Sequence, residues 1–196
     1  AGKFQDATTH LVTDAGESAS NLALVQQGIL KVSASTGTAA SDINNAMYHI
    51  ESGGMHGASG LSVLQVAAQG ARVGGADLDT VSKTLVGTLN AYGMTSSNAA
   101  TQTQMATTMM NQLIATVGAG DMKMQDLASS LSSVAPLAAA AHIQFAEVGG
   151  AIATMTAQGM SAQQATQDLS NTIRSLSNPN NVAINEMQQM GLSAQD

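Results

Sequence analysis

Few side chains in this sequence could catalyse a reaction, and they are widely separated. The 196 residues contain no Cys, and the four histidines occur far apart: His10, His49, His56 and His142. Histidine metal sites commonly repeat the residue at short spacing beside a carboxylate, and that spacing is missing. We therefore expect no metal and no cofactor. The acid whose surroundings match an enzyme motif is Glu51, which precedes a Gly-Gly pair.

The segment Ile50-Glu51-Ser52-Gly53-Gly54, followed by Gly60-Leu61-Ser62-Val63-Leu64-Gln65-Val66, resembles the motif of lytic transglycosylases. That resemblance implies a Glu at a helix end acting as general acid on a glycosidic oxygen, with the second segment lining a sugar groove. The sequence departs from the family: the two segments are close together, and Leu64 replaces Met after an extra residue. Sugar-stacking aromatics are scarce, since the chain holds only Phe4, Tyr48, Tyr92 and Phe145. A peptidoglycan-cleaving module using Glu51 is therefore the alternative hypothesis, and a last-turn residue before a glycine stop is the preferred one.

Two further glycine-rich segments have simpler interpretations. Gly57-Ala58-Ser59-Gly60 lacks the spacing of a nucleophile elbow and is interpreted as a turn. Gly118-Ala119-Gly120-Asp121 lacks the spacing of a phosphate-binding loop. We expect Asp121 to be the N-cap of the next helix.

The elements that carry these residues are predicted to be helices. Apolar residues are 44% of the chain and aromatics only 2%, and this composition favours helices over sheets. Apolar residues recur at helical spacing in the ranges 22–32, 43–50, 81–92, 105–117, 127–134, 145–155 and 169–176. The sequence thus predicts an all-α fold of about eight short to medium amphipathic helices separated by Gly stops, as a helical bundle or bent helical array.

One helix connection recurs along the chain. Gly93-Met94, Gly159-Met160 and Gly191-Leu192 are each followed by Ser or Thr within two residues. A glycine in the left-handed conformation can end a helix, the next apolar residue packs back, and the hydroxyl caps the following helix. Ser161 with Gln164 fits a capping box. Together with the Gly-Gly pair after Glu51, the helix-stop glycines are Gly54, Gly93, Gly159 and Gly191.

Charge and hydropathy exclude several classes of partner. The net charge is −7, and the six basic residues are scattered, which disfavours nucleic-acid binding through a basic stripe. We expect no sequence-specific nucleic-acid partner. A membrane-spanning helix needs about 20 predominantly apolar residues, and no window supplies them, so no membrane span is expected.

Residues 1–16 are predicted to be a lead-in helix or linker, and residues 17–194 one helical domain. The chain opens Ala-Gly-Lys without a leader pattern, and we expect it to be a fragment of a much longer chain.

The order of elements resembles the conserved helical region of phage tail tape-measure proteins. The resemblance covers residues 17 to 194 and is carried by motifs whose order and spacing match. These motifs are Gln26-Gln27-Gly28-Ile29-Leu30, the range 35–42, Asn45-Ala46-Met47-Tyr48, the range 51–54, the range 89–94, Val134-Ala135-Pro136-Leu137-Ala138-Ala139, the range 149–153, Ile173-Arg174-Ser175-Leu176, Pro179 and Met190-Gly191-Leu192.

The resemblance implies a structural virion protein without catalytic residues. It would lie in the tail lumen or tail tip, help to set tail length during assembly in the host cytoplasm, and leave the tail tube at infection. Implied partners are tail tube and tail tip proteins, tail assembly chaperones, and further copies in a homo-oligomer. The 12 Met residues and the absence of Cys predict a loosely specified core, which would help a domain to unfold or repack within a narrow tube.

Overall fold

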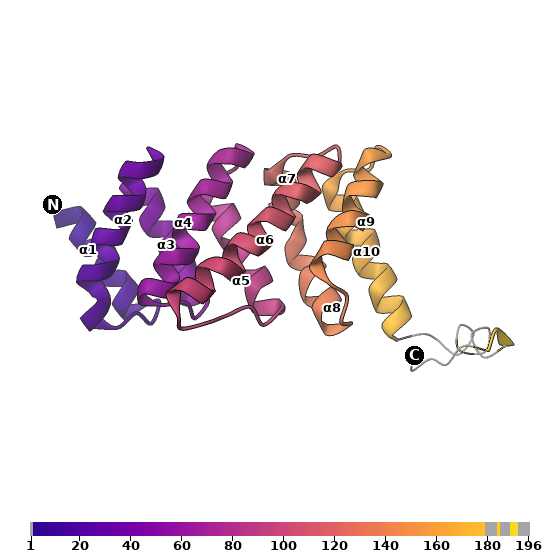
Figure 1. Cartoon of the computed structure of the whole chain (residues 1–196), viewed down its shortest axis with the longest axis horizontal. Coiled ribbons are helices and arrows are strands. Elements are labelled where there is room, and N and C mark those ends of the chain that lie inside the picture. The colour runs from indigo at the N-terminus through magenta and orange to yellow at the C-terminus, as the bar shows by residue number, and fades with distance from the viewer. Residues whose placement is uncertain (1, 179–183, 185–188, 192–196) are drawn as a thin grey trace.

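The structure is a computed structural model, and it describes residues 2–178, 184 and 189–191, with the side chains of the first helix described from Gln5 onward (Figure 1). This part of the chain is all-α, as predicted, and contains no strand. It contains ten α-helices and two 3₁₀ turns: α1 (Gly2–Thr13), η1 (Ala19–Asn21), α2 (Leu22–Thr36), α3 (Ala40–Ser52), α4 (Gly57–Gly74), α5 (Leu78–Ala91), α6 (Ala99–Ala119), α7 (Met124–Ser130), η2 (Leu131–Ser133), α8 (Ala135–Ala140), α9 (Phe145–Ala157) and α10 (Ala162–Ser177).

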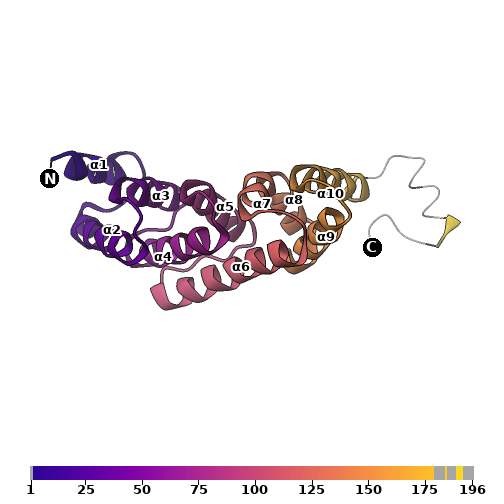
Figure 2. The same ribbon diagram turned by 90° about the horizontal axis from the view of Figure 1, so that it is seen from above.

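The helices form an elongated array of two layers (Figure 2). We call α1, α3, α5, α7, α8 and α10 layer A, and α2, α4, α6 and α9 layer B. Each helix packs on its neighbours within a layer, for example α2 on α4 and α4 on α6, and on the helices opposite. Apart from the short α7–α8 pair, the chain crosses between layers at every connection. The prediction offered a helical bundle or a bent helical array; the described helices form an array, and their number, ten, exceeds the predicted eight.

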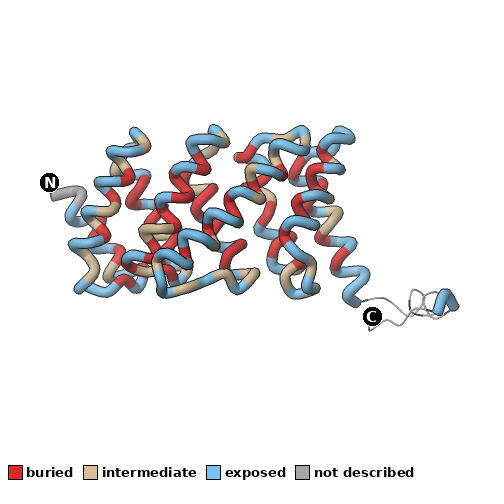
Figure 3. Tube along the Cα trace, in the orientation of Figure 1, coloured by how far each residue is buried: buried red, intermediate tan, exposed pale blue. Residues whose placement is uncertain are grey.

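The core lies between the layers and runs the length of the array (Figure 3). It is aliphatic and methionine-rich, and its large, fully buried side chains include Ile29, Ile43, Met47, Leu64, Leu85, Met109 and Leu127. Leu11 of α1 is also fully buried. The segment predicted as a lead-in is therefore a helix packed on the rest of the array.

Glycines allow the layer B helices to approach closely. A Cβ added at Gly28 of α2 would overlap the Leu61 side chain of α4. One at Gly70 of α4 would overlap Met110 of α6, and one at Gly149 of α9 would overlap the Thr116 hydroxyl of α6. Each neighbouring pair of layer B helices thus meets at a glycine.

The prediction of one continuous helix over 127–134 is wrong. α7 ends at Ser130, a 3₁₀ turn follows, and α8 begins at Ala135. Pro136 lies in the first turn of α8. A proline has no N–H to donate and its ring collides with the carbonyl four residues earlier, so the helix must restart there.

Three local predictions also need correction. Gly57-Ala58-Ser59-Gly60 is the first turn of α4 and not a separate turn. The cap residue of α7 is Lys123 and not Asp121, because the helix begins only at Met124. Ser161 does accept a hydrogen bond from the Gln164 N–H at 3.1 Å, but the Gln164 side chain donates to Asp168 and does not return to the cap.

Candidate functional site

Glu51 lies in the last turn of α3 and is buried, with 1% of its surface exposed. Gly54, at φ 87°, turns the chain away immediately afterwards. Its N–H donates to the Glu51 carbonyl at 2.8 Å, and the Met55 N–H donates to the Ile50 carbonyl at 3.2 Å. These bonds satisfy carbonyls that the helix end would otherwise leave unpaired. The glycine stop therefore fixes Glu51 against the core.

Glu17 is the second carboxyl of the site, and it comes from the segment between α1 and η1. It is 3% exposed and accepts hydrogen bonds from the Ser18 N–H at 2.7 Å and the Asn21 amide at 2.9 Å. Its other oxygen accepts from the Gly57 N–H at the start of α4, at 2.6 Å. A carboxylate is stabilised at a helix N-terminus because the first N–H groups there have no partner within the helix. Glu17 thus ties the α1–α2 connection to α4.

The pKa values of the two carboxyls are shifted in opposite directions. Burial, together with the neighbouring Glu17 carboxylate, raises the pKa of Glu51 from 4.5 to about 9. Burial acts on Glu17 in the same sense, but the hydrogen bonds it accepts outweigh burial and lower its pKa. Neither Glu51 oxygen accepts a hydrogen bond within the described part of the chain. At neutral pH Glu51 is therefore protonated, and Glu17 is ionised.

Sequence reasoning identified Glu51 but missed Glu17. The two residues are 34 positions apart in the chain and belong to no common motif. Glu17 follows a glycine, Gly16, at φ 82°, and this pattern alone does not single it out. Only the fold brings the two carboxyls together.

The second segment of the transglycosylase-like motif forms part of α4 and packs into the core. Val63 and Leu64 are fully buried and Val66 is 8% exposed. Four pockets described on this structure are lined by residues other than Glu51 and Glu17. Glu17 therefore joins the α1–α2 connection to α4, and the protonated Glu51 is surrounded by protein.

The four histidines lie in separate places. His10 pairs with Asp14 (Nδ1 to Oδ2, 2.8 Å), and His49 pairs with Asp79 (Nε2 to Oδ1, 2.7 Å). His56 is the N-cap of α4, one residue before the Gly57 N–H that donates to Glu17. Its Nδ1 is buried and has no hydrogen-bond partner among the described residues. Within the described residues, no group of three or more His, Asp or Glu side chains is placed to hold a metal ion.

The helix-stop glycines all have the left-handed conformation: φ is 87° at Gly54, 63° at Gly93, 95° at Gly159 and 77° at Gly191. After three of them the N–H of the next residue donates back to the carbonyl five residues earlier: Met55 to Ile50 at 3.2 Å, Met94 to Leu89 at 2.8 Å and Met160 to Met155 at 3.2 Å. Met94 packs on the core, whereas Met160 is 42% exposed. Leu192 lies outside the described residues.

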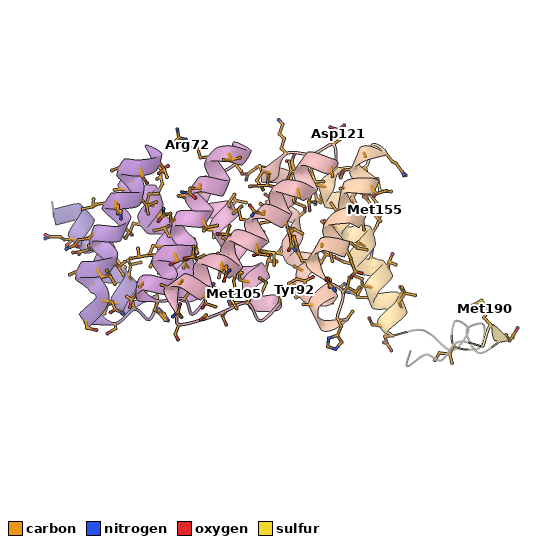
Figure 4. The ribbon with its side chains drawn as sticks, in the orientation of Figure 1. Arg72, Tyr92, Met105, Asp121, Met155 and Met190 are labelled. Carbon is orange, nitrogen blue, oxygen red and sulfur yellow. The ribbon has the colours of Figure 1, made fainter. Side chains whose placement is uncertain are left out.

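Charged residues make up only 10% of the chain. Figure 4 labels two of them, Arg72 and Asp121. Of the helices described, none is both long enough and apolar enough to cross a membrane.

Comparison with known proteins gives one match. Residues 26–196 match the family model described as phage-related minor tail protein. No curated protein and no solved structure matches the chain. Because the matched range covers most of the sequence, the chain belongs to the phage-related minor tail protein family.

Proposed function

We propose that this chain is a segment of a tail tape-measure protein, which sets tail length during assembly and is released from the tail tube at infection. The supporting observation is the order of helix motifs and glycine stops over residues 17–194, taken with the family match over residues 26–196. The family makes the chain a structural component of a phage tail. The tape-measure role is the finer proposal.

Within a tape-measure protein, this segment would be a folded part and not the measuring rod. A single helix of 196 residues would extend on the order of 290 Å at about 1.5 Å per residue. The described helices instead fold back on one another in two layers. We propose that it contacts tail tube and tail tip proteins and assembly chaperones, in several copies, in the lumen or at the tip of the virion tail, after assembly in the host cytoplasm.

The length-setting role is tested by tail measurements on phages with altered parent chains. In-frame deletions outside this segment should shorten the tail by about 1.5 Å per deleted residue, because the measuring part is expected to be helical. Electron micrographs provide the tail lengths. Tails of unchanged length in a deletion series that still assembles would contradict the tape-measure role while leaving the family assignment intact.

Release at infection is tested separately. Antibody against this segment should detect it in the fraction ejected with the DNA and not in emptied particles. Retention of all copies in emptied tails would contradict release. A low thermal midpoint of the isolated chain would agree with a core that unfolds in transit, and a midpoint above about 90 °C would count against it.

We also propose that the chain is not an enzyme. One observation favours the alternative, a lytic transglycosylase-like module: a general acid must be protonated before it acts, and Glu51 has a pKa of about 9. Two observations support the structural role instead. Glu51 is 1% exposed, and the residues at the positions of the sugar groove are buried in α4.

A further inference from the structure

A polar groove of about 760 Å³ lies between α10 and the segment formed by α7 and η2. Asp121 and Ser161 line it where these two segments begin. Ser133 and Arg174 line it near their ends. Because α7 and α10 both lead from the upper edge of the array toward the lower edge (Figure 1), the groove extends along α10. From Ser161 to Arg174 its length is about 20 Å, at about 1.5 Å per helical residue.

The walls of the groove are rich in hydrogen-bond acceptors. Thr166 and Ser170 are buried on the α10 side, and their hydroxyls donate to carbonyls of α10 at 3.0 Å and 2.7 Å. On the opposite side, the hydroxyls of Ser129 and Ser130 donate to carbonyls of α7 at 2.7 Å and 2.9 Å. A hydroxyl has one hydrogen and two lone pairs. These four hydroxyls can therefore accept a hydrogen bond from a ligand, whereas their own hydrogens are already used.

The two ends of the groove carry opposite charges. Asp121 and Asp126 line the end where α7 begins (Figure 4 labels Asp121), and Arg174 lines the other end. All three residues are exposed, and none of them forms an ion pair within residues 2–178. A ligand that pairs with both ends therefore carries a cation at one end and an anion at the other.

An extended polypeptide segment has the chemistry that this groove requires. Each of its residues offers an N–H, which matches the acceptors of the walls, and a carbonyl. The side-chain amides of Gln163, Gln167 and Asn171 also line the groove and can pair with either group. No aromatic residue is among the described residues that line it, so sugars and nucleic-acid bases have no ring to stack on.

We propose that this groove binds an extended segment of about six residues from a partner protein, since six extended residues span about 20 Å. A Lys or Arg side chain of the segment pairs with Asp121 and Asp126, and an Asp or Glu side chain pairs with Arg174. The site is separate from the length-setting role, because a tail protein of any function could use it to hold a neighbour.

A library of hexapeptides tests this proposal when their binding to the 196-residue chain is measured by fluorescence anisotropy. The peptides are blocked at both ends, so that only side chains are charged. Peptides with Lys or Arg toward one end and Asp or Glu toward the other should bind best. The double variant Asp121→Asn with Asp126→Asn should weaken their binding by about two- to fivefold at low salt and remove the preference for the basic residue. Arg174→Gln should remove the preference for the acidic residue.

Asp168→Asn is the matched control, because it removes a carboxylate from α10 that is not among the residues lining the groove. It should leave both preferences unchanged, and circular dichroism should show the same helix content in all variants. Binding without a preference for either charge, preferences that survive the groove variants, or an equal loss in Asp168→Asn would each overturn the proposal. A soluble chitin oligomer or spermidine that binds in the groove, where no peptide of the library does, would also overturn it.

Discussion

In layer B, neighbouring helices meet at Gly28, Gly70 and Gly149, whereas in layer A two neighbouring pairs are joined by a side-chain hydrogen bond in addition to their apolar packing. The Asn44 amide donates to the Ala7 carbonyl at 3.4 Å, and the Thr84 hydroxyl donates to the Ala128 carbonyl at 2.7 Å. The charged residues in the layer B helices are Lys31, Arg72 and Glu147. Layer A helices carry most of the remaining charges.

This difference shows how a chain without Trp and with few aromatics can specify its packing. Small residues let two helices approach until their backbones and short side chains interlock, so the contact depends on shape. Hydrogen bonds between helices depend on direction instead. Close approach at glycines recurs along layer B, and side-chain hydrogen bonds join two of the layer A pairs. Glu17 and Glu51 lie where α3 of layer A passes into α4 of layer B.

The largest expected effect comes from filling the layer B contacts. Gly28→Ala, Gly70→Ala and Gly149→Ala should each lower the free energy of unfolding by about 1–3 kcal/mol, because the added methyl overlaps a packed side chain. The contacts are separate, so the three effects should approximately add in the triple variant. Urea denaturation provides the measurement.

The matched controls are helical glycines with open space around them. A Cβ at Gly150 of α9 or at Gly87 of α5 would have no neighbour within 4 Å. Gly150→Ala and Gly87→Ala should each stabilise the chain by about 0.5–1 kcal/mol, because Ala has the higher helix propensity. Equal effects of Gly149→Ala and Gly150→Ala would show that the close approach at Gly149 does not contribute to the packing of layer B.

The next effect is a pH dependence at the junction of the layers. The pKa of Glu51 is about 9 in the folded chain against an ordinary value of 4.5. Between these values the folded state holds the extra proton, so the free energy of unfolding should fall as pH rises, by at most about 1.4 kcal/mol per pH unit. Glu51→Gln, which mimics the protonated acid, should remove this fall when urea midpoints are compared from pH 5 to pH 9.

Glu17→Gln is the contrasting variant. The lowered pKa of Glu17 means that its ionised form contributes stability above its ordinary pKa of 4.5, and that this contribution is lost as pH falls through the folded-state value. Glu17→Gln should therefore be less stable than wild type at neutral pH, because it has one acceptor oxygen in place of two. If the stability of Glu51→Gln depended on pH as that of the wild type does, the claim that Glu51 is protonated in the folded chain would be refuted.

A smaller effect is expected from a layer A hydrogen bond. Thr84→Val retains the shape of the side chain but leaves the Ala128 carbonyl without this donor, and it should cost about 0.5–1.5 kcal/mol. Thr108→Val is the control, because that exposed hydroxyl donates only within its own helix α6, to the Gln104 carbonyl at 2.9 Å. Equal losses in thermal melts of the two variants would show that the contact between helices contributes nothing.

The smallest effect is expected at the layer A surface. Lys83 pairs with Asp79 at 2.7 Å, and the Lys83 side chain is 54% exposed. Lys83→Ala should change the free energy of unfolding by about 0.2–1 kcal/mol at low salt and by less at high salt. An effect above this range that persists in 1 M salt would mean that Lys83 contributes by packing of its side chain and not by an exposed ion pair within α5.

Helical periodicity predicted most of the helices, because buried apolar residues such as Ile43, Met47 and Ile50 recur every three or four positions in the sequence. It missed the start of α4, where Gly57 and Gly60 look like turn residues. The fold explains both: Gly57 has φ 54° beside Asn21, and a Cβ at Gly60 would overlap the Met55 carbonyl. Close approach between distant segments leaves no local pattern.

The same limit applies to the candidate site. The glycine stop after Glu51 was visible, because a helix end is a local feature. Its burial and its Glu17 partner depend on the packing of the α1–α2 connection against α4, which no spacing along the chain encodes. The raised pKa of Glu51 is thus a result of this packing and not of the enzyme-like motif around it.

The central claim is that the chain acts through its helical architecture and not through chemistry at Glu51. The direct measurement is release of soluble sugar fragments from purified peptidoglycan by the wild-type chain and by Glu51→Gln, whose folds are matched by circular dichroism. We predict no release above the protein-free level for either. Fragment release by the wild type that Glu51→Gln abolishes would contradict the claim.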